Sequence, residues 1–161
     1  MMSAKDEPLP ILASDAPVRN RPSNYPEPFA SRMSGRTKQP LGELFMLKNF
    51  GVNLICLPPG CVSALHHRHT QQDEFIYVLE GTPTLYRGDE IHPLAPGMVV
   101  GFPSGGLAHH LENRSNSDCV ILEVGDRRAG DSVLYPSDDI QAMSAPDGEW
   151  LFVHKDGPPY I

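Results

Sequence analysis

The sequence contains a series of short apolar runs, each ended by a Gly or Pro turn, and this pattern most constrains the fold of the 161-residue chain. The runs begin at about Leu41, have the length of β-strands and show no helical periodicity. Strands are expected over residues 52–57, 75–79, 84–86, 91–94, 98–102, 119–124, 133–135 and 150–154, and a short helix near 138–143. The pattern is typical of a β-sandwich or a β-barrel, and we expect an all-β fold with a single antiparallel β-barrel over residues 41–126.

Both ends of the chain extend beyond this predicted barrel. Residues 1–40 are punctuated by proline, which fits neither helix interiors nor central strands, so they predict an extended N-terminal arm. The arm carries apolar side chains that need a surface on the same barrel or on a partner subunit, namely Ile11, Leu12, Val18, Tyr25 and Phe29. We therefore expect a homodimer. Residues 127–161 are expected to form a C-terminal extension that packs on the barrel.

The composition excludes several classes of partner. A formal net charge of −7 disfavours binding to nucleic acid, whose phosphate backbone is also negative. No apolar stretch is long enough to predict a membrane span, and nothing at the start resembles a secretory signal. The odd number of cysteines, three, is typical of free thiols in a reducing cytoplasm. A small molecule and a second copy of the chain are the expected partners of a cytoplasmic protein.

Two segments carry the residue types of a metal site. His67 and His69 are two residues apart, so their side chains share one face of a strand. Glu74 is five residues beyond His69, so a turn over residues 70–72 must reset the alternation before Glu74 can point the same way. His109 lies in the second segment. Three imidazoles and a carboxylate form a donor set that holds a divalent transition metal and can leave coordination positions open.

Strand alternation also assigns the neighbouring side chains. If Glu74 points into the barrel, Ile76 and Val78 do so as well. The outer face of that strand then carries Phe75, Tyr77 and Leu79. In the second segment, His109 shares its face with Leu111 and Asn113.

Each piece of this pattern also has a plainer explanation. A lone His-x-His is usually a solvated loop, and Asp73-Glu74 alone is usually surface charge. His109 and His110 could be a hydrogen-bonded structural pair, and His66 or His110 could take the place of its neighbour as a ligand. The joint occurrence of these pieces on strands separated by turns favours the metal site.

These residues resemble the two sequence motifs of the cupin superfamily. The first motif is represented by Gly60, His67, His69, Glu74 and Gly81. The second motif is represented by Gly97, Pro103, Gly105, His109 and Asn113. Six residues rather than five separate Gly60 from His67, and three rather than two separate Gly105 from His109. The resemblance covers about residues 50–125.

The resemblance implies a double-stranded β-helix and a metal bound by His67, His69, Glu74 and His109. The ligand types suit Zn, Fe, Mn, Ni or Co without separating them. Cupins carry out many reactions, so the fold alone does not give the function. By analogy with the family we expect an isomerase or epimerase acting on a sugar or sugar phosphate. An Fe-dependent dioxygenase and a non-catalytic small-molecule binding module are the alternatives.

The sequence does not identify a catalytic residue beyond the metal ligands. A sugar phosphate requires a cationic clamp, and the candidates are Arg68, Arg87, Arg114 and Lys48. Candidates for acid or base catalysis are His66, His92, His110 and His154. The sequence shows no partner for any of these four histidines.

Overall fold

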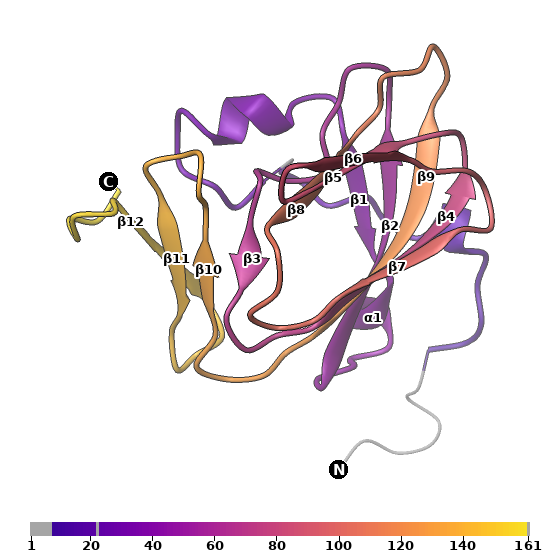
Figure 1. The fold of residues 1–161 in the computed structure, drawn as a ribbon. Helices are drawn as coiled ribbons and strands as arrows, with labels where there is room; N and C mark the ends of the chain where they lie inside the picture. The colour runs from indigo at the N-terminus through magenta and orange to yellow at the C-terminus, as the bar shows by residue number, and fades with distance from the viewer. Residues whose placement is uncertain (1–7, 22, 161) are drawn as a thin grey trace.

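The computed structural model describes residues 8–21 and 23–160 and consists mainly of antiparallel β-strands (Figure 1). The first strands are β1 (Thr37–Pro40), β2 (Phe50–Leu57), β3 (Arg68–His69), β4 (Glu74–Glu80), β5 (Thr84–Arg87) and β6 (Glu90–Pro93). The remaining strands are β7 (Val99–Phe102), β8 (His109–Glu112), β9 (Cys119–Asp126), β10 (Ser132–Leu134), β11 (Gln141–Ser144) and β12 (Trp150–Val153). The helical elements are short, namely η1 (Ala13–Asp15), η2 (Ala30–Met33) and α1 (Leu41–Leu44).

The strands form three sheets. The largest has five strands in the order β1-β2-β9-β4-β7, the second has the order β12-β11-β10-β3, and the third has the order β6-β5-β8. The pairings named within these sheets are antiparallel. The predicted all-β antiparallel fold is therefore confirmed, and strand pairing begins at Thr37 in the last part of the arm.

The inner face of β4 has the predicted alternation. Ile76 and Val78 are 4% and 0% exposed, whereas Phe75, Tyr77 and Leu79 are 40%, 39% and 41% exposed. When one face of a sheet is buried, the burial of every second side chain fixes the register of its strands. The buried side chains belong to a core cluster of Ile55, Leu57, Ile76, Val78, Leu85, Leu94, Phe102, Leu111, Cys119 and Ile121.

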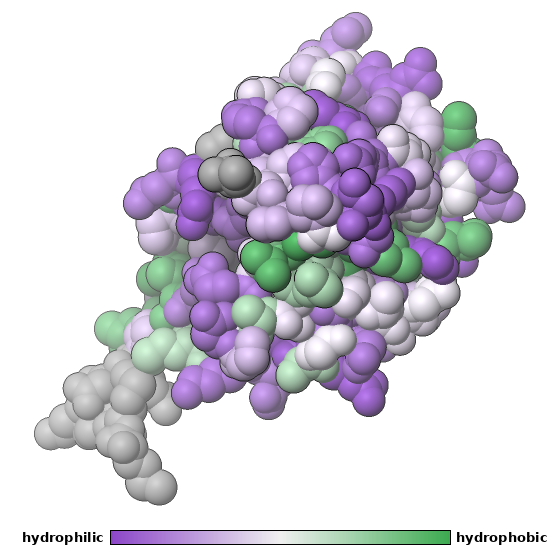
Figure 2. Space-filling view, turned by 90° about the vertical axis from the view of Figure 1, so that its left-hand side faces the viewer, coloured by the Kyte–Doolittle hydropathy of each residue, from purple (hydrophilic) through white to green (hydrophobic). Residues whose placement is uncertain are grey.

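The helix predicted near residues 138–143 is wrong, because this segment contains strand β11, which pairs with β10 and β12. Ile140 and Ala142 are buried and Met143 is exposed, which is the two-residue period of a strand. The strand predicted at residues 150–154 is confirmed as β12. Figure 2 shows the C-terminal side of the molecule, where a band of hydrophobic residues crosses a mostly hydrophilic face.

The N-terminal arm packs on its own chain from about residue 13 onward, where Gln39 Nε2 donates to the Ala13 carbonyl oxygen and Ala16 is buried. Phe29 and Met33 are buried in a second core cluster together with Val133, Tyr135 and Ile140. The proline-rich segment thus contributes to a core, because its aromatic and Met side chains fill the space beside the C-terminal sheet. Of the other apolar arm residues named from the sequence, Tyr25 packs against this cluster, whereas Ile11, Leu12 and Val18 are exposed.

Gly81 ends β4 at a point where the chain approaches β9 closely. Its φ of +75° lies in the left-handed region, and a Cβ at this position would lie 2.5 Å from the Asp118 carbonyl oxygen and 2.8 Å from the Cys119 Cα. Only glycine avoids both the backbone strain and this overlap. Gly81, the second glycine of the first motif, therefore has a structural role.

Among residues 8–21 and 23–160, the chain forms no helix that is both long and apolar enough to span a bilayer.

Candidate metal centre

Backbone pairing brings the two histidine segments together. The His67 N–H donates to the His109 carbonyl oxygen at 3.1 Å, and the His109 N–H donates to the His67 carbonyl oxygen at 2.8 Å. Residues paired in this way in antiparallel strands point their side chains to the same side. Glu74 reaches the same place from the start of β4.

Glu74 lies at the centre of the histidine group. Its Oε2 is 3.2 Å from His67 Nε2 and 2.9 Å from His109 Nε2, and its Oε1 is 3.6 Å from His69 Nε2. Potential ligand atoms of His67, His69 and Glu74 all lie within 4.8 Å of one another. The structure thus gathers the four residues singled out in the sequence, with His109 joined to the group through Glu74.

Hydrogen bonds at the far side of each ring decide which nitrogen faces Glu74. His67 Nδ1 lies 2.8 Å from the Leu65 carbonyl oxygen, and His109 Nδ1 lies 3.4 Å from the Leu107 carbonyl oxygen. A carbonyl oxygen can only accept, so each Nδ1 carries a proton and each Nε2 presents its lone pair when the ring is neutral.

The donor set fits a metal ion. Lone pairs on two neutral Nε2 atoms and on a carboxylate repel one another unless a cation lies between them. A proton on one ring can supply a positive charge to part of this group. A divalent transition ion, which imidazole and carboxylate bind well, supplies positive charge to all the donors at once.

Asp131 is a residue of the candidate site that the sequence analysis missed. Its Oδ2 accepts a hydrogen bond from His69 Nδ1 at 2.5 Å, which leaves His69 Nε2 free to face Glu74. Such a carboxylate behind a metal-binding histidine fixes the tautomer and the ring orientation.

The other oxygen of Asp131 organises the turn over residues 70–72. Its Oδ1 accepts from the backbone N–H groups of Thr70, Gln71 and Gln72 at 3.0, 2.8 and 3.3 Å. This turn provides the expected change of phase between His69 and Glu74. Asp131 is 62 positions from His69, and no spacing pattern connects the two residues.

The carboxylates shift the proton affinity of the histidines. Burial lowers the pKa of His69, but Glu74 and Asp131 outweigh it and raise the pKa to about 9. Burial has the larger effect at His109 and lowers its pKa. Burial raises the pKa of Glu74, yet the surrounding histidines hold it well below its usual range. At neutral pH a proton therefore occupies His69 in the metal-free protein, and a metal ion must displace it.

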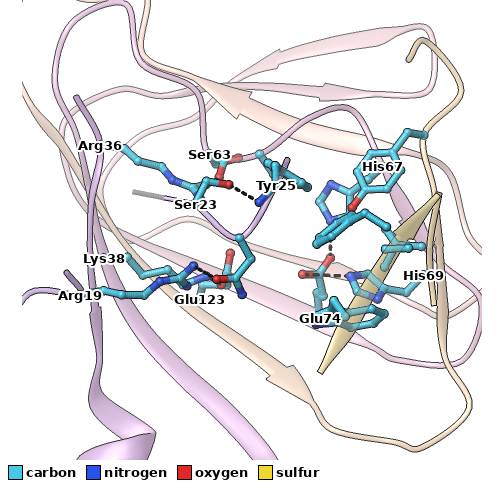
Figure 3. A pocket seen from close by; sticks show the side chains of 17 residues that line it. Arg19, Ser23, Tyr25, Arg36, Lys38, Ser63, His67, His69, Glu74 and Glu123 are labelled. Carbon is cyan, nitrogen blue, oxygen red and sulfur yellow. Dashed lines mark hydrogen bonds and ion pairs between the residues drawn. The ribbon is translucent and has the colours of Figure 1, made fainter. Parts of the chain in front are cut away.

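The donor set opens into a cavity of about 180 Å³ (Figure 3). This is smaller than the roughly 300 Å³ of the smallest pockets typical of drug-sized ligands, which favours a small ligand. Aromatic side chains form part of the wall, namely Tyr25, Tyr135, Trp150 and Phe152. Much of this wall comes from the arm and the C-terminal extension.

The four cations named as candidates for a phosphate clamp are not brought together at this cavity. Arg68, Arg87, Arg114 and Lys48 do not belong to the described lining of this cavity. Three other cations line it, namely Arg19, Arg36 and Lys38. The two-residue spacing of Arg36 and Lys38 indicated that their side chains share one face of a strand. The arm, however, was not expected to reach the candidate metal centre.

The remaining histidines lie outside the metal centre. His66 Nδ1 and His110 Nδ1 are 2.9 Å apart in a separate surface pocket, where the His110 ring stacks on Tyr86. Burial lowers the pKa of both histidines. Each of the other two has a carboxylate partner, Glu90 for His92 and Asp139 for His154. All four thus have partners, which the sequence did not identify.

Comparisons with known proteins place this geometry in context. The family described as "Cupin domain" matches residues 53–125. A sugar phosphate isomerase of the cupin superfamily from Silicibacter pomeroyi is 34% identical, with 95% of this chain and 97% of that chain covered and a TM-score of 0.87. A proposed sugar phosphate isomerase from Acidithiobacillus ferrooxidans is 35% identical, with coverage of 75% and 77% and a TM-score of 0.69.

A structure with lower sequence identity is named for a different activity. A predicted oxalate decarboxylase from Thermotoga maritima is 25% identical, with 73% of this chain and 98% of that chain covered and a TM-score of 0.58. Among curated proteins, none matches this sequence.

Proposed function

The chain belongs to the cupin superfamily, and on that premise we propose that it is a metal-dependent isomerase that interconverts the aldose and ketose forms of a small sugar phosphate. One observation carries the proposal: a single small cavity contains both a metal-competent donor set and a second carboxylate, Glu123. The names of the relatives from S. pomeroyi and A. ferrooxidans support the substrate class.

We assign the metal to His67, His69, Glu74 and His109. The first three line the cavity, and His109 joins them through Glu74. When bound, the ion supplies a Lewis acid that polarises the carbonyl group of the sugar. The burial of these side chains excludes bulk water, which strengthens electrostatic interactions with the substrate.

Glu123 is the proposed base. It lies opposite Ile76 in the pairing of β9 with β4, so its side chain is on the inner face, diagonal to Glu74. Lys38 Nζ and Asn53 Nδ2 both donate to Oε1 of Glu123, at 2.9 and 3.1 Å. These two hydrogen bonds orient the carboxylate toward the cavity that it lines (Figure 3).

Isomerisation requires one proton to move between neighbouring carbons. In the proposed reaction, Glu123 takes the proton from the hydroxyl-bearing carbon next to the carbonyl and returns it to the former carbonyl carbon. The hydroxyl proton moves to the former carbonyl oxygen, so the product is an isomer and no other reactant is consumed. General base catalysis by a positioned carboxylate contributes about 10²–10⁴-fold to such rates.

The variant Glu123→Gln tests this assignment. We expect kcat for aldose–ketose interconversion of four- to six-carbon sugar phosphates to fall by about 10²–10⁴-fold, because the amide cannot accept the proton. Metal content should stay unchanged. Glu80→Gln, on the exposed part of β4, is the matched control. Wild-type turnover by Glu123→Gln would exclude Glu123 as the base.

We also propose that the chain forms a homodimer that covers the outer face of β4. Phe75, Tyr77 and Leu79 are partly exposed there, next to the edge strand β7. Light scattering at micromolar concentration is expected to give the mass of a dimer, and Tyr77→Lys, which adds a charge to this face, should give monomers. A monomer mass for the wild-type chain would contradict the proposal.

A further inference from the structure

A second pair of histidines lies on the outer face of the strands that carry the metal centre. His67 and His109 form an antiparallel bridge, so the next residues along the two strands, His66 and His110, also lie opposite each other. Side chains alternate across a strand, and this second pair therefore points away from Glu74. The alternation is visible in the burial of residues 62–67, where the fully buried members are Ser63, Leu65 and His67.

The two outer histidines open into a surface pocket of about 570 Å³. Tyr86 lies opposite His110 in the pairing of β5 with β8, and its ring stacks on the His110 ring with centroids 4.7 Å apart. This stacking holds the His110 ring in place at the wall of the pocket. The pocket is separate from the cavity of the metal centre, because the strands lie between them.

The charge of this pocket favours a cation. Arg32 Nη1 donates to Asp138 Oδ1, so these two charges compensate each other. Glu112 is the carboxylate that remains among the described residues that line the pocket. With neutral imidazoles, the lining has a formal charge of −1.

The distance between the two imidazole nitrogens fits a metal ion of particular geometry. His66 Nδ1 and His110 Nδ1 are 2.9 Å apart. Two nitrogen ligands that are each about 2.0–2.1 Å from an ion are about 2.8–3.0 Å apart at a right angle and about 3.3–3.4 Å apart in a tetrahedron. The observed distance matches right-angle coordination, which is typical of Ni²⁺ and Cu²⁺ and not of tetrahedral Zn²⁺.

A carboxylate behind one ring sets the protonation that an ion requires. Glu112 Oε1 accepts from His110 Nε2 at 3.4 Å, which leaves the lone pair of His110 Nδ1 facing His66. Without an ion, His66 Nδ1 donates its proton to that lone pair. An ion that replaces this proton binds both Nδ1 atoms. Glu112 then supports His110 as Asp131 supports His69.

We propose that His66 and His110 form a second metal site, which binds Ni²⁺ or Cu²⁺ through the two Nδ1 atoms. This site does not depend on the proposed function. The ion would join residues 62–67 to β8 on the face opposite the metal centre. Because it binds only where these two segments are paired, it should stabilise the folded protein.

Equilibrium dialysis of the metal-stripped, full-length protein against Ni²⁺ tests the proposal. Ni²⁺ is the probe because, unlike Cu²⁺, it does not oxidise the free thiols of the chain. We expect His66→Gln and His110→Gln each to bind one ion fewer per chain than the wild type. The melting temperature of the wild type should also rise more with Ni²⁺ than that of either variant. His92→Gln is the matched control and should bind as many ions as the wild type, since His92 is an exposed histidine paired with Glu90.

A double variant tests whether the two sites are separate. His69→Ala removes a proposed ligand of the metal centre, so its combination with His66→Gln should bind one ion fewer than His69→Ala alone. Equal numbers of ions in these two proteins would contradict a separate site.

Two further results would overturn the proposal. The wild-type number of ions in both His66→Gln and His110→Gln would show that the pair is only a hydrogen-bonded structural pair. The same loss in His92→Gln as in His66→Gln would show that Ni²⁺ binds exposed histidines in general.

Discussion

Replacing His69 by alanine is expected to remove most of the metal from the purified protein. His69 faces Glu74 through Nε2, and Asp131 holds the ring in this orientation. Losing a ligand should cost more affinity than the roughly 10–100-fold that follows loss of an outer hydrogen-bond partner. Elemental analysis of unstripped protein measures the effect.

His92→Ala is the matched control for this substitution. His92 is an exposed histidine on β6 that contacts Glu90, and its replacement should leave the metal content at the wild-type level. Wild-type metal content in a folded His69→Ala protein would contradict the assignment of His69 as a ligand.

Asp131→Asn is expected to lower metal affinity by about 10–100-fold. The asparagine oxygen can still accept from the three backbone N–H groups of the turn over residues 70–72. Its amide group can replace the Asp131 oxygen next to His69 Nδ1, but an amide nitrogen cannot accept the proton of that ring. The change should therefore act on the tautomer of His69 more than on the turn.

Two measurements separate this positioning role from a general loss of stability. Metal titration should show the lower affinity, and nitrogen NMR of the imidazole should show a changed tautomer at His69. Asp139→Asn is the matched control, because Asp139 contacts His154 Nδ1 at 2.8 Å outside the metal centre. Equal metal affinities for Asp131→Asn and Asp139→Asn would contradict the proposed role of Asp131.

The sequence predicted the parts of the structure that depend on local periodicity. Alternation along β4 placed Ile76 and Val78 inside, and the odd step from His69 to Glu74 required the turn that the structure contains. The same reasoning failed at residues 138–143, where Ile140 and Ala142 are buried by contacts with distant segments. A short apolar pattern does not distinguish a strand from a helical turn without those contacts.

The residues that sequence reasoning missed come from the two ends of the chain. Asp131 reaches His69 only because β10 pairs with β3, and Arg19 reaches the cavity only because the arm runs beside β1. Neither contact has a spacing signature, because both join segments that are distant along the chain. The arm and the C-terminal extension are therefore parts of the candidate site.

The most direct test of a metal-dependent isomerase is proton NMR of the reaction in D₂O with protein before and after chelation. We predict that metal-loaded protein converts an aldose phosphate to its ketose with deuterium incorporated at the carbon next to the carbonyl. Chelated protein should do neither, and re-addition of the divalent ion should restore both. Conversion that persists at full rate after complete metal removal, or metal-loaded protein that neither converts nor exchanges any sugar phosphate of four to six carbons, would contradict the account.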